Sequence, residues 1–355
     1  MAELTIASGS GWFFQDFRHW PDTCCLIGMK PGTLDVIVPA HNAGRFLGAT
    51  LQSVALQHVL PRSVIVVDDR STDDTAAVAV ACAADYADFL PIRLLHNTGP
   101  RGPSAARNLA IRRSDAEFIA LLDADDLLTP AHHQLLLSAI QAAPGIVVAF
   151  GDSTEFNAHG EVVRSQFAKS GIGARRATTL ANGIFTPADG MFAALLGAGA
   201  FGTSACILRR QAALDAGLFD ETLRFGEDTD LFLRLALAGR FAFTRAKVMH
   251  KREHDSNLTH ARNTPEFDRA KVLSLTRLMA QAETLELSAA EKDALHAELA
   301  RAIDAYTYHA SRRGPAGYGD ALRLARGAGR PAIAFKPRHL ARMVLRGMGT
   351  SSRTA

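Results

Sequence analysis

The stretch EFIALLDADD, from Glu117 to Asp126, decides how the rest of the chain is interpreted. Residues 118–122 are continuously apolar, and Asp123, Asp125 and Asp126 follow at once. A short apolar run that ends in acids is typical of a buried strand whose carboxyl end opens into a site. Three carboxylates this close repel one another, and because their oxygens are hard ligands we expect Mg²⁺ or Mn²⁺ among them. The alternative interpretation is an acidic turn that caps the following helix.

Short apolar runs alternate with helical patterns on the N-terminal side of this stretch. Further strands are predicted at 35–39, 64–67 and 92–95, with helices of about 12 residues between them, which indicates an α/β fold built from parallel βαβ units. In such sheets ligands bind beyond the carboxyl ends of the strands. Polar side chains fall at four of these ends: His41 and Asn42, Asp68 and Asp69, Asn97, and the acids of 123–126.

The second half of the chain has weaker patterns. Strands are predicted at 149–150, 162–163, 205–208 and 241–248, and an amphipathic helix opens at the acids 227–230. Residues 171–183, rich in Gly and Ala, are interpreted as a mobile loop, and residues 132–133 as a solvated helix face. We divide the chain into an N-terminal extension (1–33), a main domain (34–264, with halves 34–126 and 127–264) and a basic helical appendage (265–355).

Composition fits a globular protein. The chain has 355 residues, of which 48% are hydrophobic and 21% charged, and its net charge is +3. The four cysteines lack metal-ligand spacing, and the N-terminus does not have the pattern of a signal peptide, so we expect a cytoplasmic protein. No apolar run of about 18 residues is present, so no membrane-spanning helix is predicted.

The C-terminal segment has a net charge of +9, and the rest of the chain has a net charge of −6. From Arg312 to the end there are ten Lys and Arg residues and one acid, Asp320. Residues 332–346 combine basic and apolar positions, with Pro337 as the first residue that a helix there could have. This pattern predicts peripheral contact with the inner face of the cell membrane; the alternative is a solvated appendage. Nucleic acid is not expected as a partner because no aromatic residues are interleaved with the charges.

Five motifs in one order resemble family 2 glycosyltransferases of the GT-A fold. They are DVIVPAHN (35–42), VIVVDDRSTD (64–73), ARN (106–108), LDADD (122–126) and GED with LRL (226–228, 233–235). The resemblance covers about 33–260 and implies a Rossmann-like, mostly parallel sheet flanked by helices. It also implies a nucleotide-sugar donor, with a UDP-sugar favoured, a Mn²⁺ or Mg²⁺ ion, and inverting hexosyl transfer. The acceptor would be a hydroxyl of a glycan or lipid-linked molecule in surface polysaccharide synthesis.

The same resemblance assigns roles to single residues. The predicted nucleotide-pocket residues are Pro39, His41 and Asn42, with Asp69 accepting a hydrogen bond from the base. The predicted metal and diphosphate residues are Asp123, Asp125 and Asp126, with Asp125 and Asp126 nearest the metal. Asp228 matches the general base. Residues 251–259 resemble a loop that closes over the diphosphate, with Arg252 and His254 as its contacts, and His254 is also a candidate metal ligand.

Three residues raise separate questions. Arg107 has a planar fork that suits a phosphate or an Asp, and a purely structural ion pair is the alternative. Arg70 stands where the motif usually has Gly, and could change the loop or add a phosphate or acceptor contact. His41 stands where Tyr is more usual, which keeps a flat ring and adds a titratable group.

Other functions fit the motifs less well. A non-catalytic GT-A-like protein that binds a nucleotide or a partner is the main alternative, although the presence of both Asp125 and Asp228 argues against it. A dinucleotide-dependent oxidoreductase is disfavoured because residues 39–44 read PAHNAG and not a Gly-rich fingerprint. A nucleotidyltransferase would share the Asp cluster but would leave 227–228 without a role.

Overall fold

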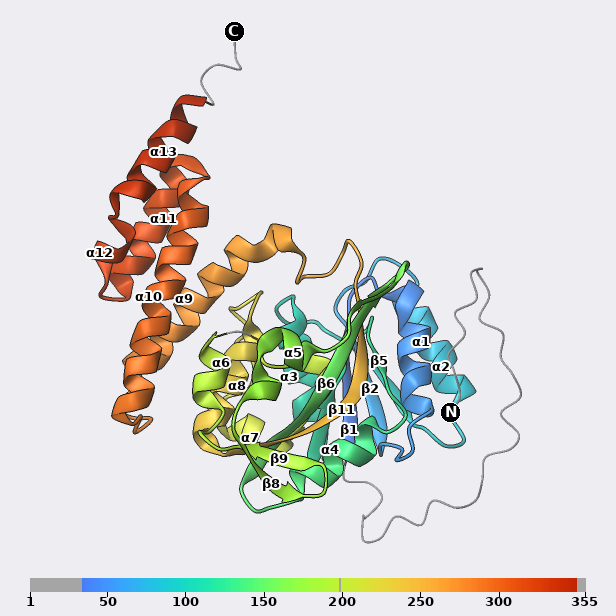
Figure 1. Ribbon diagram of the computed structural model, residues 1–355. Coiled ribbons are helices and arrows are strands. Elements are labelled where there is room, and N and C mark those ends of the chain that lie inside the picture. The colour runs from blue at the N-terminus through green and yellow to red at the C-terminus, as the bar shows by residue number, and fades with distance from the viewer. Residues whose placement is uncertain (1–33, 198, 350–355) are drawn as a thin grey trace. The chain divides into compact units, whose positions relative to one another are not determined.

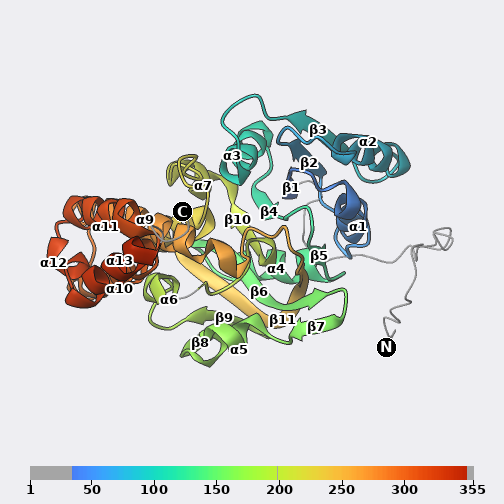
Figure 2. The ribbon, with the colours of Figure 1, turned by 90° about the horizontal axis from the view of Figure 1, so that it is seen from above.

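The computed structural model describes residues 34–197 and 199–349, which lie within one compact unit, Pro31–Ala355. The N-terminal extension predicted over 1–33 lies outside the described residues. An 11-stranded sheet with flanking helices forms the main body (Figure 1). Along the main path its strand order is β3-β2-β1-β4-β10-β6-β11-β9-β8 (Figure 2).

The first half of the sheet is parallel, as the sequence predicted. Its strands are β1 (Leu34–Ala40), β2 (Ser63–Asp68), β3 (Ile92–His96) and β4 (Phe118–Leu121). The helices between them are α1 (Gly44–Ala55), α2 (Thr75–Asp85) and α3 (Pro103–Arg113). Every residue of β2 and β4 is buried, which explains their continuous apolar sequence. Their carboxyl ends therefore deliver the predicted polar residues to one edge of the sheet.

The second half is mixed. A four-residue strand, β10 (Cys206–Arg209), lies antiparallel between β4 and β6 (Ile146–Asn157) and joins the two halves. Strand β11 (Arg240–Arg252) runs parallel to β6 and also pairs with the short β5 (Leu127–Leu128). Strands β7 (Gly160–Val163), β8 (Ala177–Ala181) and β9 (Ile184–Pro187) add the remaining antiparallel pairs.

Two predictions were wrong. Residues 171–183 are not an irregular loop: they include a 3₁₀ turn, η1 (Ile172–Ala174), and strand β8, which pairs with β9. The helix face at 132–133 is not solvated. His132 and His133 are fully buried because α4 (His132–Ile140) packs on β6, β10 and β11, and each ring bonds a carbonyl oxygen, that of Ser204 or Val59.

The second half also contains further helices and a 3₁₀ turn. They are α5 (Gln166–Ser170), α6 (Phe192–Gly197), α7 (Arg210–Asp215) and α8 (Glu227–Ala238), with a second 3₁₀ turn, η2 (Thr203–Ala205), directly before β10. Helix α8 begins at Gly226, whose φ of 66° suits glycine. It therefore presents its first residues, Glu227 and Asp228, at a sharp turn of the chain.

The C-terminal region is helical, as predicted. It consists of α9 (Thr264–Ala280), α10 (Ala289–Ser311), α11 (Gly314–Gly327), α12 (Pro331–Ala334) and α13 (Pro337–Gly349). Ser288 and Glu291 form a capping box that starts α10, and Pro337 is the first residue of α13. No helix of the described residues combines the length and the apolarity that crossing a membrane requires.

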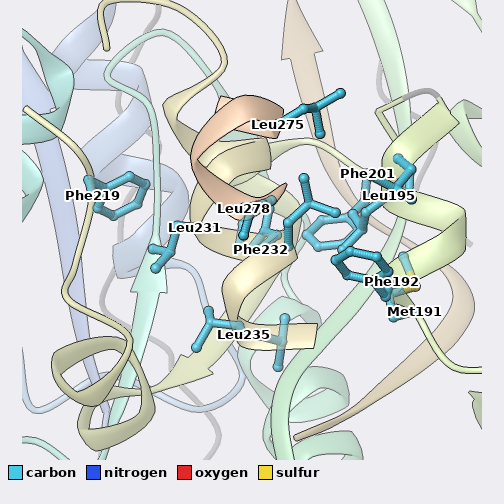
Figure 3. Close-up of a cluster of buried hydrophobic side chains, with 14 of the residues drawn as sticks. Met191, Phe192, Leu195, Phe201, Phe219, Leu231, Phe232, Leu235, Leu275 and Leu278 are labelled. Atoms are coloured by element: carbon cyan, nitrogen blue, oxygen red, sulfur yellow. The ribbon is translucent and has the colours of Figure 1, made fainter. Parts of the chain in front are cut away.

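One apolar cluster joins α8 to α9. Leu231, Phe232 and Leu235 of α8 belong to the same buried cluster as Leu275 and Leu278 of α9 (Figure 3). Polar contacts reinforce it: the Ser274 hydroxyl bonds Asp230, and Arg277 pairs with Asp220. Helix α8, whose first turn contains Asp228, therefore packs against helix α9 of the C-terminal region.

Candidate functional site

The acidic cluster follows β4 and divides into two exposed carboxylates and one buried one. The side chains of Asp123 and Asp125 are 37% and 25% exposed, whereas Asp126 is 4% exposed. Asp126 accepts hydrogen bonds from the Ser204 hydroxyl (2.7 Å) and the Arg252 backbone N–H (3.1 Å). Burial, with the charges of Asp125 and Asp123, raises the pKa of Asp126 well above its usual value. Two carboxylates therefore face solvent while the third anchors the turn.

Arg107, from α3, joins the acidic cluster to the start of α8. Its guanidinium is buried and donates to Asp123 (2.6 Å) and Glu227 (2.8 Å). Burial alone would lower the pKa of Arg107, but the two carboxylates raise it by more than burial lowers it. The guanidinium therefore stays positively charged. Burial raises the pKa of Glu227 to about 7 in spite of Arg107. The structure contains the ion pair considered for Arg107, and its predicted contact with the donor phosphate stays a prediction.

Asp228 follows Glu227 and is held by both of its oxygens. The Thr203 hydroxyl donates to one oxygen (3.0 Å), and the backbone N–H of Thr229 donates to the other (2.6 Å). The carboxylate is partly buried at the start of α8, where the helix dipole favours a negative charge. Its position is therefore set by the turn before β10 and by its own helix.

The turn η2 contacts both Asp228 and the acidic cluster after β4, and the sequence did not predict these contacts. Thr203 bonds Asp228, while the hydroxyl of the next residue, Ser204, accepts the Asp123 N–H (3.0 Å) and donates to Asp126. The residues that Ser204 connects lie about 80 positions earlier in the chain, and a Thr-Ser pair before a strand is too common to signal such a contact. The turn η2 lies beside the acidic cluster because it directly precedes β10, and β10 pairs with β4 in the middle of the sheet.

The predicted nucleotide-pocket residues lie together at the ends of β1 and β2. His41 bonds the backbone oxygen of Asp69 (2.8 Å), and Pro39 is in ladder register with Val67. Asn42, in the left-handed region with a φ of 50°, accepts the Thr72 N–H through its side chain. These contacts connect the two strand ends on which the predicted pocket depends.

Asp69 is buried, and its side chain is hydrogen-bonded to the neighbouring loop. Its carboxylate accepts hydrogen bonds from the Asn97 amide (2.6 Å) and the Gly102 N–H (2.7 Å). Asn97 in turn donates to the Pro100 carbonyl. The structure thus shows Asp69 shaping the 97–102 loop, beside the role in base recognition that the resemblance implies.

Arg70 has the left-handed backbone that explains why glycine is usual at this position. Its φ is 60°, a conformation that costs a branched or long residue about 1 kcal/mol. The guanidinium donates to the carbonyl oxygens of Thr98 (3.2 Å) and Gly99 (2.6 Å). Arg70 therefore offsets its strain by bracing the same loop that Asp69 shapes.

The loop that follows β11 reaches back over the acidic cluster. The His254 ring bonds Asp125 (2.8 Å) and stacks on Phe46 of α1, with ring centroids 4.6 Å apart. Arg252 donates to the Asp125 carbonyl and lies over the rings of Phe46 and Phe156. Both residues predicted to close over the diphosphate thus already contact the turn that carries the exposed acids.

The residues present could bind a divalent cation only if water or substrate phosphates supplied the rest of its ligands. No group of three or more His, Cys, Asp or Glu side chains arranged to hold a metal ion occurs in the described part of the chain. Asp123 and Asp125 nevertheless offer exposed carboxylate oxygens, the ligands that Mg²⁺ and Mn²⁺ prefer, and such ions commonly take the rest of their ligands from water and substrate phosphates. A site completed by a diphosphate is compatible with this donor set.

The comparisons with known proteins agree with the motif order and the fold. The sequence model described as Glycosyl transferase family 2 matches residues 35–214, which is half of the chain. The chain belongs to glycosyl transferase family 2. The matched segment runs from β1 through β10 into α7 and includes the acidic cluster, Arg107 and η2.

Two curated relatives come from Rhizobium meliloti. The chain is 32% identical to the succinoglycan biosynthesis protein ExoU over 241 residues, and 30% identical to the succinoglycan biosynthesis protein ExoO over 235 residues. Each alignment covers 63% of this chain, with 62% of ExoU and 64% of ExoO. The chain therefore matches less than two thirds of the length of each relative.

Solved glycosyltransferases share the fold at low sequence identity. S. aureus TarS 1–349 superposes with a TM-score of 0.57 and 17% identity, over 91% of this chain and 93% of TarS. The mannosyltransferase PcManGT from Pyrobaculum calidifontis, in complex with GDP-Man and Mn²⁺, superposes with a TM-score of 0.55 and 16% identity. The match covers 92% of this chain and 89% of PcManGT. TarS was also solved in complex with UDP-GlcNAc, and that structure gives a TM-score of 0.54. These neighbours support the predicted GT-A fold.

Proposed function

We propose that this chain is a metal-dependent, inverting glycosyltransferase that moves a hexose from a nucleotide-sugar, with a UDP-sugar favoured, to an acceptor hydroxyl. The observation that carries the proposal is the single network Asp123–Arg107–Glu227, next to Asp228. It links the motif for the donor diphosphate to the residue proposed as the base. The acceptor would be a glycan or a lipid-linked molecule of surface polysaccharide synthesis, which the names of ExoU and ExoO support.

In this mechanism Asp228 takes the proton of the acceptor hydroxyl. The hydroxyl oxygen forms a bond to the anomeric carbon while the bond from that carbon to the diphosphate oxygen breaks, and the diphosphate leaves with the bonding electrons. A base positioned in this way contributes on the order of 10²–10⁴-fold to the rate. The hydrogen bonds from Thr203 and Thr229 hold the carboxylate for this step.

Mn²⁺ or Mg²⁺ would be held at Asp125, with His254 beside it, and would neutralise the leaving diphosphate. Asp125 and His254, whose side chains already contact each other, are the residues that would hold the ion. Asp126 stays a predicted further ligand through lone pairs that Ser204 and Arg252 do not use. Asp123 is proposed to bind the donor beside the metal, oriented by Arg107. The Mn²⁺ in the PcManGT complex supports use of a divalent ion.

The donor site of the proposal is the nucleotide pocket at the ends of β1 and β2. Pro39, His41 and Asn42 would line it, and Asp69 would contact the base while it holds the 97–102 loop. Arg252 would turn from the Asp125 carbonyl toward the diphosphate when the loop closes. The UDP-GlcNAc and GDP-Man complexes of the structural neighbours support a nucleotide-sugar as the donor.

Calorimetric titration of the full chain with UDP, GDP and dTDP, each with and without Mn²⁺, tests the donor site. We expect one nucleotide to bind in a metal-dependent way, and we expect Asp125→Ala to remove the metal dependence. Asp215→Ala, which changes an exposed Asp on α7, is the matched control and should bind like the wild type. Binding of none of the three nucleotides under any condition would favour a non-catalytic protein.

A further inference from the structure

A second pocket lies in the C-terminal region, formed by residues outside the candidate active site. It has a volume of about 420 Å³ and opens between α10 and α13. The lining side chains that carry charge or can carry it are Asp304 and His309 on α10 and Arg338, His339 and Arg342 on α13, and Tyr308 lies among them. Such a concentration of cationic groups around a cavity suits an anion.

The one carboxylate in the pocket wall is already neutralised. Asp304 accepts hydrogen bonds from Lys336 (2.8 Å) and His339 (2.9 Å) and pairs with Arg338. These contacts surround Pro337 and hold the start of α13 against α10. Asp268 lies 3.6 Å from His309 of the pocket wall. The permanent charge around the cavity remains positive, because Arg312 and Arg342 come in addition to Lys336 and Arg338.

Arg342, which lines the pocket, and Arg312, which contacts the lining residue Tyr308, have no acidic partner in the described part of the chain. The guanidinium carbons of Arg342 and Arg312 lie 4.3 Å and 5.7 Å from the centre of the Tyr308 ring. Arg312 also donates to the Tyr308 hydroxyl (3.2 Å), and Arg342 lies 3.4 Å from His339. Within 34–197 and 199–343, no carboxylate forms an ion pair with either guanidinium. Most of their ten N–H donors are therefore free for a ligand, and a planar fork suits phosphate oxygens.

The surroundings of the pocket point to the source of that phosphate. Phe335 and Leu340, which precede and follow the start of α13, are 46% and 37% exposed. The segment from Arg312 onward carries ten basic residues and one acid. Exposed apolar side chains beside concentrated positive charge match the surface of a membrane that contains anionic lipids.

We propose that the pocket between α10 and α13 binds the phosphate of an acidic phospholipid headgroup and so docks the C-terminal region on a membrane. Arg312 and Arg342 contact the phosphate, Tyr308 keeps both guanidiniums in place, and Phe335 and Leu340 enter the interface beside it. This inference does not rest on the proposed function, because it uses no residue of the donor or acceptor site.

Sedimentation of the full chain with phosphatidylcholine vesicles, with and without phosphatidylglycerol, tests the proposal. We expect binding only to the anionic vesicles, and a loss of about tenfold or more in Arg312→Gln/Arg342→Gln. The matched control is Arg323→Gln/Arg326→Gln, which removes the same charge from exposed positions of α11. Circular dichroism of both variants confirms that the helices are intact.

Two outcomes would overturn the proposal. An equal loss of vesicle binding in both double variants would mean that diffuse charge acts and the pocket does not. Absence of binding to anionic vesicles would exclude the lipid; calorimetry with glycerol phosphate on the same variants would then show whether a soluble phosphate occupies the pocket instead. Unchanged activity in the pocket variant on a soluble acceptor is the expected companion result, because the pocket is separate from the active site.

Discussion

At the scale of single residues, Asp228 is the sharpest test of the proposed chemistry. In Asp228→Asn the amide cannot take a proton, so we expect transfer to fall on the order of 10²–10⁴-fold. The donor site uses other residues, and nucleotide affinity should therefore stay nearly the same. Product formation and calorimetric nucleotide binding, measured on the same preparation, check the two halves of this expectation. A parallel loss of nucleotide binding would show that Asp228 is structural.

Arg70 allows backbone strain to be measured separately from side-chain contacts. Arg70→Ala loses the bonds to the Thr98 and Gly99 carbonyls and keeps a β-carbon at a φ of 60°, whereas Arg70→Gly loses the same bonds and relieves the strain. We expect the glycine variant to be more stable than the alanine variant by about 1 kcal/mol. Urea unfolding of the two variants measures the difference. Equal stabilities would mean that the left-handed backbone costs nothing here.

Residue identity was predictable where the chemistry is local in sequence. The acids of 123–126, Asp228, Arg252 and His254 were named from motifs, and the structure places each of them in one connected site. Ser204 could not be found in this way, because its function depends on a contact with Asp126 across 78 positions of the chain. The roles of these residues in catalysis and metal binding remain predictions until the experiments above are done.

At the scale of elements, the buried start of α4 predicts a dependence of stability on pH. Burial lowers the pKa of His133 to about 4, against about 6.5 in the unfolded chain, and also lowers that of His132. The unfolded state therefore binds more protons below pH 6.5, and stability falls as the pH drops from about 6.5 to about 4. For His133 the loss amounts to about 3 kcal/mol.

Urea unfolding between pH 7 and pH 4 measures this effect. In His133→Gln the amide can still donate to the Val59 carbonyl but cannot titrate, so the dependence of stability on pH should become flatter. His159→Gln, at an exposed turn between β6 and β7, is the control and should follow the wild type. An identical slope in His133→Gln and the wild type would contradict the assignment.

Elements of the first half were predictable because each has one repeating pattern. Strand β6 was recognised only at 149–150, although it extends over Ile146–Asn157, because its second part is polar. Asp152 and Glu155 are buried there, and Lys247 and Lys169 compensate their charges from other parts of the chain. A strand whose buried acids depend on distant lysines has no local signal of burial.

At the scale of the whole molecule, α9 is expected to stabilise the helix that carries Asp228. Leu275 is 1% exposed within the cluster shared with α8, so Leu275→Ala should lower the free energy of unfolding by about 2–5 kcal/mol. Leu340→Ala removes an exposed side chain on α13 and should change the free energy of unfolding by less than about 0.5 kcal/mol. Chemical denaturation measures both. A loss confined to the C-terminal helices, with the rest of the chain unaffected, would show that the two regions are energetically independent.

The domain arrangement was the least predictable level. A helical region after residue 264 was expected from composition, and α9 begins at Thr264. The contacts of Ser274 with Asp230 and of Arg277 with Asp220 could not be expected, because they join ordinary polar residues far apart in the sequence. We propose that the C-terminal helices α9 to α13 are required for the stability of the main domain.

The place of β10 also constrains how the chain is synthesised and folded. Strand β4 is complete at Leu121, but the strand that covers its free edge begins only at Cys206. While a ribosome makes the intervening residues, the nascent sheet has an unpaired, apolar edge, the kind of surface that chaperones bind and that aggregates. Pairing between such distant segments also slows folding. We therefore expect the growing chain to need protection until β10 has emerged.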